Sequence, residues 1–365
     1  MQKNPYCALE LRIIKKKRNR MAFKNLIFTV VGATGAVGNA VLSLLAERGI
    51  PKENVQAVAS KRSLGASVSY GDHAELAIKP LEHFDFSTTH IAFFAVSSDI
   101  SAEYMLRATQ QGALVIDKSS YFRMNADVPL IVPEVNPDAI AHAAKRRIIA
   151  NPNCSTIQLV ATLKPIHDIN PIKRIVLSTY QAVSGAGSNA MDILYNETKT
   201  VLMNQPSTPN TTFPKPIAFN VIPKIDVFMD DGGSKEEWKM IEETKKILSP
   251  DIRVAATCVR VPVFVGHSIA VTLELTQTFD VKEIIKALKT SKALKVAGTI
   301  DQFHTPSEAA QEDYIFVSRI RRDTSTENGL SLWIVADNLR KGAALNAVQI
   351  AEHAYKHHKY LIRDH

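Results

Sequence analysis

The segment Gly32-Ala33-Thr34-Gly35-Ala36-Val37-Gly38 decides the fold of the first half of the chain. An apolar run at residues 26–31 leads directly into it, and apolar residues recur at helical spacing from 40 to 45. A strand, a glycine-rich turn and a helix in this order are typical of a dinucleotide-binding unit, because the glycines let the backbone approach a pyrophosphate at a helix N-terminus. A tight turn without a ligand is the alternative. The residues expected to contact the cofactor here are Gly32, Thr34, Gly35, Ala36, Val37 and Gly38.

The end of the second expected strand, at residues 55–59, indicates which nicotinamide cofactor binds. An NAD enzyme usually has an acidic residue there, which binds the ribose 2′-hydroxyl. This chain instead has Ser60, Lys61, Arg62 and Ser63, which offer cations and hydroxyls without a carboxylate. The sequence therefore predicts NADP, with Ser60, Arg62 and Ser63 as contacts of its 2′-phosphate. An exposed basic loop is the alternative.

Strands and a helix continue to alternate in the following residues. Strands are expected near 75–78, 91–96 and 113–116, with a helix at 101–111. Such alternation predicts a parallel, doubly wound sheet. Ser97 follows the strand at 91–96, at the sheet edge where ligands bind in open α/β folds.

After residue 154 the pattern changes. Strand-like runs at 175–182, 254–265 and 269–275 surround a helix expected at 235–248, and residues 204–216 are predicted to form a loop. This pattern favours an α+β domain with a mainly antiparallel sheet. The amphipathic segment 341–360 is expected to be a helix that packs back on the first domain.

The segment Asn151-Pro152-Asn153-Cys154-Ser155-Thr156 joins an apolar strand to a run with helical spacing that Pro165 is expected to close. Cys154 is therefore predicted to lie in the first turn of a helix. The helix dipole should lower the pKa of its thiol, and backbone N–H groups with the Asn153 side chain could hold an oxyanion. A buried structural cysteine is the alternative.

Composition excludes several classes of protein. The net charge is +8, but residues 1–20 carry seven basic side chains and one acid, +6 in all, which leaves +2 for the remaining residues. A nucleic-acid-binding protein should instead show its basic excess on a folded domain. No apolar run reaches membrane-spanning length, so no membrane partner is expected. Three scattered cysteines indicate reduced thiols and a cytoplasmic location.

Further motifs line up with the cysteine segment. They are YQAVSGAG at 180–187, FNVIPKID at 219–226, EEWKM at 236–240, CVRVP at 258–262, GHS at 266–268 and DNLRKGAA at 337–344. In this order, and with the segments at 32–38 and 151–156, they resemble the aspartate-β-semialdehyde dehydrogenase family over almost the whole chain from Met21. Two departures are Val96, where the family often has glycine, and the basic leader.

The resemblance implies a role for each matching residue. Cys154 is implied as the nucleophile, His267 as the acid/base group, and Gln181 as the residue that positions thioester and substrate. The remaining implied contacts are Arg260, Glu236 and Asn153 for the substrate, Arg123 and Lys239 for phosphate, and Ser97, Ser184, Gly185 and Asn338 for the cofactor. The implied reaction interconverts aspartate-β-semialdehyde, phosphate and NADP⁺ with aspartyl-β-phosphate and NADPH, in a homodimer or a dimer of dimers.

Several alternatives remain open at this point. His267 could be a satisfied core histidine, and Arg123 and Lys239 could be surface cations. Arg260 and His267 are seven residues apart, which would place them on opposite faces of one continuous strand. Reductases of other acyl phosphates, such as N-acetylglutamyl phosphate or glyceraldehyde phosphate, use the same cysteine and histidine. No metal site is expected from His353 and His357, which lack a third ligand.

The fold class predicted for the chain is α/β: a Rossmann-like NADP-binding domain plus an α+β catalytic and dimerisation domain. The first domain is expected to comprise residues 21–153 plus 338–365, and the second residues 154–337. Residues 1–20 are expected to be a disordered basic leader, an over-long start or, with less support, an anchoring arm. A transit peptide is disfavoured because these residues contain no serine.

Overall fold

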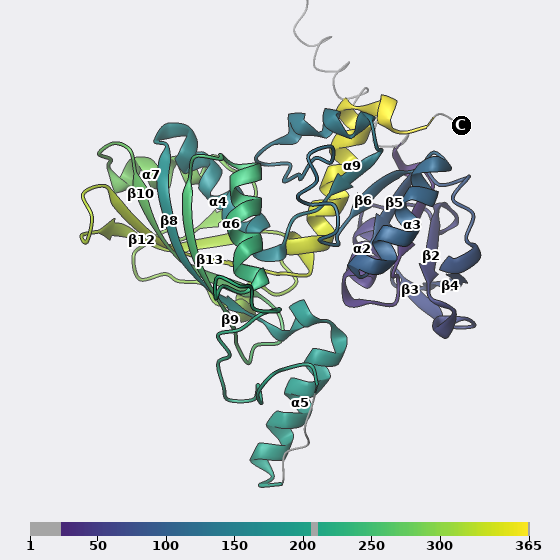
Figure 1. Ribbon diagram of the computed structural model, residues 1–365, viewed down its shortest axis with the longest axis horizontal. Coiled ribbons are helices and arrows are strands. Elements are labelled where there is room, and N and C mark those ends of the chain that lie inside the picture. Colours follow the sequence, from purple (N-terminus) through teal and green to yellow (C-terminus); the bar gives the residue numbers. More distant parts are fainter. Residues whose placement is uncertain (1–22, 206–210, 364–365) are drawn as a thin grey trace, which may run out of the picture.

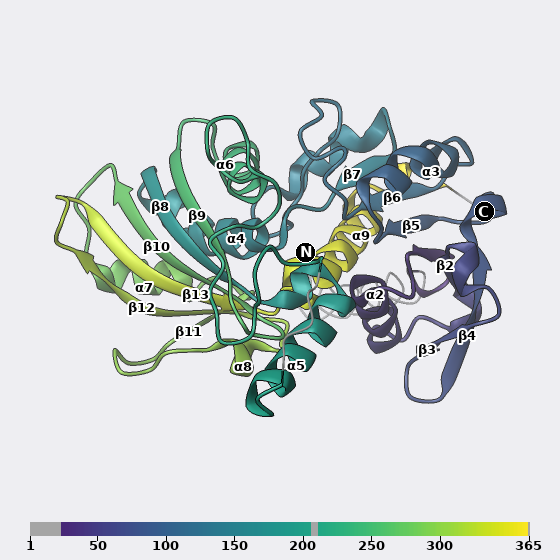
Figure 2. The same cartoon turned by 60° about the horizontal axis from the view of Figure 1, so that its bottom comes forward.

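The computed structural model describes residues 23–205 and 211–363. The expected leader therefore lies outside the described residues. Figure 1 shows two sheets side by side, with the helix α9 (Leu345–His357) between them. Figure 2 shows α4 (Cys154–Ile169) between the second sheet and α9.

The first sheet has seven strands in the order β3-β4-β2-β1-β5-β6-β7. Its strands are β1 (Phe28–Val31), β2 (Val55–Ala59), β3 (Ser67–Tyr70), β4 (Ala74–Pro80), β5 (Ile91–Phe94), β6 (Leu114–Asp117) and β7 (Ile148–Ala150). All neighbours are parallel except the edge pair β3–β4. The predicted parallel sheet is confirmed, with an antiparallel edge strand that sequence reasoning missed.

Helices cover both faces of this sheet. One face packs against α2 (Ala36–Glu47) and α9, and the other against α3 (Ser98–Gln110). The last helix thus packs on the first part of the chain, as predicted. It begins later than expected, because a π-helical turn at Arg340–Ala344 precedes it.

The second sheet has six strands in the order β11-β12-β13-β10-β8-β9. They are β8 (Ile172–Gln181), β9 (Arg253–Arg260), β10 (His267–Leu275), β11 (Leu294–Val296), β12 (Ile315–Asp323) and β13 (Gly329–Ala336). The sheet is mixed: β8–β9 and β11–β12 are parallel, and the three central pairs are antiparallel. The prediction of a mainly antiparallel sheet is confirmed, since three of the five strand pairs are antiparallel, and the parallel pair at each edge was not expected.

One face of the second sheet packs against α4, with α6 (Lys235–Ile247) and α7 (Val281–Leu288) beside it. The opposite face carries Val176 and Tyr180, which are 37% and 39% exposed, with Trp333 beside Tyr180 at a ring-centroid distance of 5.4 Å. Helix α6 begins at a capping box, in which Ser234 and Glu237 satisfy each other's backbone N–H groups.

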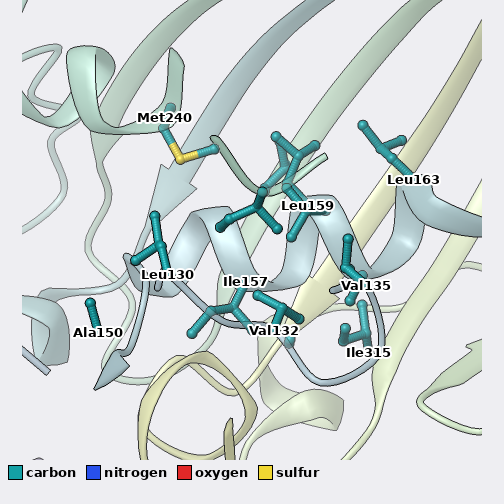
Figure 3. Packing of buried hydrophobic residues seen from close by; sticks show 14 of the residues in the cluster. Leu130, Val132, Val135, Ala150, Ile157, Leu159, Leu163, Met240 and Ile315 are labelled. Atoms are coloured by element: carbon teal, nitrogen blue, oxygen red, sulfur yellow. The ribbon is translucent and has the colours of Figure 1, made fainter. Parts of the chain in front are cut away.

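Helix α4 belongs to the core that joins the two parts of the molecule. Figure 3 shows its Ile157, Leu159 and Leu163 packed among apolar side chains from the segment before β7, from α6 and from β12. Pro165 does not close α4 as predicted but lies inside it. Ile166 is fully buried and its carbonyl accepts the Asn170 N–H at 2.9 Å, so packing keeps the last turn helical despite the proline.

Helix α5 (Ser188–Leu202) projects away from both sheets in Figure 1. It has a small core of its own, in which Ala190 and Leu194 meet Phe213 and Ile217. The sequence indicated none of α5, α7, β12 or β13. Helix α5 ends before the predicted loop at 204–216, and the described residues of that loop form neither helix nor strand.

Candidate active site

A cavity of about 500 Å³ lies between the two parts of the molecule. Both parts contribute to its wall. The predicted site residues that line it are Gly35, Ala36, Val37, Ser97, Arg123, Asn153, Cys154, Gln181, Ser184, Gly185, Glu236, Lys239, Arg260 and Asn338. One pocket therefore unites residues that are more than 300 positions apart in the sequence.

The glycine-rich turn meets this cavity with the first turn of α2. A Cβ on Gly38 would lie 2.1 Å from the Gly32 carbonyl oxygen, and one on Gly32, which has φ +84°, would lie 2.4 Å from the Ala95 oxygen. Both positions therefore require glycine. Gly35 caps α2 without a side chain that could satisfy the first N–H groups, and Ala36 and Val37 line the cavity. Free N–H groups at a helix N-terminus fit a phosphate, so the turn suits a dinucleotide.

The basic loop after β2 stands apart from the cavity wall. Lys61–Ser63 form a 3₁₀ turn that Ser60 precedes, and the Arg62 side chain is exposed. The Lys61 N–H donates to the Glu82 carboxylate at 3.2 Å, so an acidic group does lie beside this loop. The loop leaves the carboxyl edge of β2, next to β1 and its glycine turn, and its role in cofactor choice stays a prediction.

Cys154 is the first residue of α4, as the sequence predicts. Asn153 caps the helix: its Oδ1 accepts the N–H groups of Ser155 at 2.9 Å and Thr156 at 3.4 Å. Its side-chain amide donates to Glu236 at 2.8 Å. One N–H of the Asn153 amide is therefore engaged by Glu236, and the role of its second N–H toward an oxyanion stays a prediction.

The predicted lowering of the Cys154 pKa is wrong for this structure. Burial raises the pKa of the thiol, and the Glu236 carboxylate raises it further. The cations of Lys118, Arg260 and Arg123 act in the opposite direction without overcoming the burial. The sequence argument considered only the helix dipole, whereas burial depends on the elements that close over the helix end.

Arg260 and His267 meet at Gly185. A Cβ on Gly185 would lie 3.1 Å from Arg260 Nη1 and 3.3 Å from His267 Nε2. Strand β9 ends at Arg260 and β10 begins at His267, so the seven-residue spacing spans a turn and the two side chains are not forced apart. Arg260 Nη1 also donates to the Ala182 carbonyl at 2.6 Å.

His267 is fully buried, and the Ala182 N–H donates to its Nδ1 at 3.0 Å. A neutral ring that accepts at Nδ1 carries its proton on Nε2. Nε2 has no hydrogen-bond partner among the described residues. Burial and the Arg260 cation lower the pKa of His267 to about 3, so the ring is neutral at physiological pH.

Helix α6 supplies the charged side of the cavity. Glu236 accepts hydrogen bonds from Asn153, from Gln181 at 3.0 Å and from Lys239 at 3.2 Å. Burial acts to raise the pKa of Glu236, but Lys239 and these hydrogen bonds hold it below its ordinary value. Lys239 also pairs with Asp226 at 2.8 Å.

Arg123 is buried and pairs with Glu243 at 2.8 Å. It also donates to the backbone carbonyls of Ser119 and Lys118. The readings of Arg123 and Lys239 as surface cations are therefore wrong, since both line the cavity within a network of charges.

Polar residues opposite α6 complete the wall. Asn338 donates to the Ser184 hydroxyl at 3.0 Å and accepts the Gly266 N–H at 2.9 Å. Gly342 lies against Cys154, since a Cβ on Gly342 would be 3.1 Å from the Cys154 Cβ. Val96, where the resembling family often has glycine, lines the cavity beside Gly32.

Sequence reasoning missed three charged residues of the site: Lys118, Asp226 and Glu243. Lys118 directly follows β6 at the carboxyl edge of the sheet, the same signal that identified Ser97. Glu243 lies seven residues after Glu236 on α6, hence on the same helix face. Asp226 lies in an irregular segment and gave no local signal.

No group of three or more histidine, cysteine or acidic side chains in the described ranges could hold a metal ion. Among those same residues, no helix is both long and apolar enough to cross a membrane. The rings of His353 and His357 lie 4.5 Å apart at the end of α9, away from the residues that line the cavity.

Comparison with known proteins gives a consistent result. Residues 28–143 match the family described as semialdehyde dehydrogenase, NAD binding domain, and residues 163–341 match semialdehyde dehydrogenase, dimerisation domain. The chain is 46% identical over 329 residues to an aspartate-semialdehyde dehydrogenase of Rickettsia bellii, covering 90% of this chain and 97% of the relative. It is 46% identical over 324 residues to aspartate-semialdehyde dehydrogenase 2 of Vibrio cholerae, covering 88% and 96%. The crystal structure of Vibrio cholerae aspartate semialdehyde dehydrogenase II complexed with ASA has a TM-score of 0.88 at 45% identity, covering 91% of this chain and 98% of that one.

Proposed function

The chain belongs to the aspartate-semialdehyde dehydrogenase family, and we propose that it interconverts L-aspartate-β-semialdehyde, phosphate and NADP⁺ with L-aspartyl-β-phosphate and NADPH. One observation carries the proposal: Cys154, at the start of α4, shares a cavity with a dinucleotide-type turn and with Arg260 and Glu236. In the reducing direction this reaction would supply the synthesis of lysine, threonine, methionine and diaminopimelate.

Cys154 is the nucleophile of the proposed reaction. Its thiolate adds to the aldehyde carbon and forms a hemithioacetal, which loses a hydride to become a thioester. A nicotinamide cofactor, when bound, would supply the acceptor for that hydride. Phosphate then attacks the thioester carbonyl, the C–S bond breaks, and the Cys154 thiolate is regenerated. Because water would hydrolyse the thioester, the limited exposure of Cys154, with Gly342 against its Cβ, favours transfer to phosphate.

His267 is arranged to donate a hydrogen bond to the substrate oxygen. The Ala182 N–H occupies Nδ1, and Nε2–H points to the space beside Gly185. A donor there stabilises the oxygen of the hemithioacetal as negative charge develops. To take up the hydroxyl proton, the acid/base role that the family resemblance implies, the ring must break its bond with the Ala182 N–H or change tautomer.

The head group of the proposed substrate is a zwitterion, and the cavity offers one charge of each sign to receive it. The planar guanidinium of Arg260 suits the α-carboxylate, and the Glu236 carboxylate suits the ammonium group. The carboxamide of Gln181, bonded to Glu236, lies where it can position both substrate and thioester. Arg123 and Lys239 are proposed to bind the phosphate.

The cofactor site is an NAD(P)-binding domain, and we propose NADP as its ligand. The support is the basic loop, in which the exposed Arg62 follows β2 at the edge next to the glycine turn. A guanidinium there would form charge-assisted hydrogen bonds with a 2′-phosphate.

The protein is further proposed to act as a homodimer in the cytoplasm. The matched dimerisation family and the open face of the second sheet, with Val176, Tyr180 and Trp333, support self-association. A dimer of dimers, formed from two such homodimers, is a further proposal.

The test is phosphate-dependent reduction of NADP⁺ with aspartate semialdehyde, measured at 340 nm as an ordinary NADPH assay. The same assay with N-acetylglutamate semialdehyde and with glyceraldehyde 3-phosphate separates the acyl-phosphate reductases that share this chemistry. Turnover of aspartate semialdehyde that requires phosphate supports the proposal. Preference for either other aldehyde would refute the assignment of Arg260 and Glu236 to a zwitterionic head group.

A further inference from the structure

The ammonium of Lys118 lines the cavity but has no part in the chemistry described so far. Its backbone is held on both sides: the Lys118 N–H donates to the Phe94 carbonyl at 2.9 Å, and its own carbonyl accepts Arg123 Nη2 at 2.7 Å. Because β5 and Arg123 fix the main chain, the lysine side chain starts from a defined point at the sheet edge.

The other cations of the cavity are each engaged by acceptors within the protein. Arg123 pairs with Glu243, Lys239 with Asp226 and Glu236, and Arg260 donates to the Ala182 carbonyl. The Lys118 ammonium, by contrast, forms neither an ion pair nor a hydrogen bond with any other described residue. Lys118 is partly buried, so its ammonium is available to an anion that lies in the cavity.

The neighbouring acidic groups leave one candidate for that anion. Asp117, the preceding residue, is saturated by the Ser119 N–H, the Ser119 hydroxyl and the Ser101 hydroxyl. Its oxygens are therefore already engaged as acceptors. Cys154 lines the same cavity as Lys118, and their two segments are joined where the Asn151 N–H donates to the Asp117 carbonyl at 2.7 Å. A charge on either group favours the charged form of the other.

We propose that Lys118 is the counter-ion of the Cys154 thiolate, and so sets how readily the nucleophile ionises. The inference rests on the proposed function only in calling Cys154 the nucleophile. Three more charged groups face the sulfur: Glu236 from α6 opposes ionisation, while Arg260 at the end of β9 and Arg123 favour it. Of the three cations Lys118 is the one without a hydrogen-bond or ion-pair partner among the described residues, so no acceptor in the protein holds its ammonium away from the sulfur. Lys118 acts through Cys154 and is an electrostatic positioning residue.

The test measures how the rate of Cys154 alkylation by iodoacetamide depends on pH, because only the thiolate reacts. Cys7 is first replaced by serine, since it lies outside the described residues, and the buried Cys258 serves as the internal unreactive thiol. Labelled peptides are quantified by mass spectrometry. Lys118→Met and Lys118→Gln remove the charge, Lys118→Arg restores a cation, and Lys145→Met is the matched control. Lys145 is exposed and lies outside the cavity, so Lys145→Met removes the same unit of net charge away from Cys154.

We expect the midpoint of the alkylation profile to rise by about one pH unit or more in Lys118→Met and Lys118→Gln. Lys118→Arg should return it close to the parent value, and Lys145→Met should leave it unchanged. An unchanged midpoint in the Met and Gln variants would overturn the proposal. So would an equal rise in Lys118→Arg, which would show that side-chain shape and not charge matters.

The measurement needs no substrate, so its outcome is independent of the dehydrogenase assay. If the midpoint shifts as expected in a chain that does not turn over aspartate semialdehyde, only the proposed function fails. If the chain is an active dehydrogenase and the midpoint does not move, only the role of Lys118 fails.

Discussion

The Glu243 carboxylate accepts the backbone N–H of Asn153 at 2.7 Å, and so ties helix α6 to the turn that precedes Cys154. Its other oxygen binds Arg123 at 2.8 Å. The carboxylate is 1% exposed, so neither contact is weakened by water. One side chain from the second half of the chain thus fixes both the cysteine turn and a cation of the cavity.

Glu243→Gln should therefore destabilise the protein and lower its turnover rate. The amide still accepts from Asn153 but leaves Arg123 buried without a counter-charge, at a cost of about 3 kcal/mol. Denaturant unfolding measures the loss, and Glu242→Gln is the control, because that neighbouring residue of α6 forms a partly exposed pair with Lys245. Equal stability of Glu243→Gln and wild type would contradict the expected role of the pair.

Cys154→Ser should fold and bind NADPH but lose turnover by at least about a thousandfold, because the serine hydroxyl is hardly ionised at neutral pH. Cofactor fluorescence and steady-state kinetics separate binding from chemistry. Cys258→Ser, at the buried cysteine of β9, shows what the loss of a thiol does elsewhere. Activity of Cys154→Ser within about tenfold of wild type would rule out the thioester mechanism.

Arg260→Lys should lower kcat/KM for aspartate semialdehyde by about a hundredfold, which corresponds to about 3 kcal/mol. Lysine keeps the charge but loses the planar fork that can bind Ala182 and a carboxylate together. KM for NADP⁺ should stay near the wild-type value. Arg253→Lys, at the exposed start of the same strand, is the control. Equal damage to the kinetics of both ligands would mean that Arg260 is structural.

Arg62→Ala tests the choice of cofactor. Loss of a charge-assisted contact with the 2′-phosphate should weaken NADP⁺ by about tenfold to a hundredfold and leave NAD⁺ almost unaffected. KM is measured for both cofactors at constant ionic strength, with the exposed Lys52→Ala as the control. If wild type already prefers NAD⁺, the basic loop has been misassigned, and Glu82 beside it becomes the candidate contact for the ribose.

The buried His267 makes the stability of the protein depend on pH. Its folded pKa of about 3 lies below the ordinary value of 6.5, so below pH 6.5 the unfolded chain binds a proton that the folded chain does not. Stability contributed by the neutral ring is thus fully present above pH 6.5 and falls with decreasing pH, by about 1.4 kcal/mol per unit, until about pH 3. Between about pH 4.5 and 6.5, the free energy of unfolding of His267→Gln should therefore depend less on pH than that of wild type. The difference in slope should correspond to about one proton. A slope equal to that of wild type would show that His267 titrates alike in the folded and unfolded states.

Local signals in the sequence predicted what is local in the structure. The glycine turn and the position of Cys154 at a helix start depend on neighbouring residues, and both are found where expected. The end of α4 was missed, because the burial of Ile166 outweighs the lost hydrogen bond of Pro165. Strands β12 and β13 also gave no usable signal, since their pairing joins segments whose register only the folded sheet defines.

The electrostatics of the site could not be predicted from neighbouring residues in the sequence either. The Asn153 amide donates to Glu236, which is 83 residues away, and the charges that act on the Cys154 thiol include Glu236 on α6, Arg260 at the end of β9 and Lys118 after β6. A rule based on the helix dipole alone gives the wrong direction for the pKa of that thiol. The cysteine was identifiable from its sequence, but its protonation state was not.

Helix α9 completes the hydrophobic layer over the first sheet, although almost the entire second half of the chain separates the two in sequence. The ring of Tyr355 in this helix lies 5.3 Å from that of Phe23, just ahead of the first strand. During synthesis the first sheet therefore emerges before α9, and the part of its face that α9 covers beside α2 stays open until that helix is made. A nascent chain that stops before residue 345 lacks the part of this apolar layer that α9 supplies, and Phe28, Val30 and their neighbours are then more open to chaperones or to aggregation.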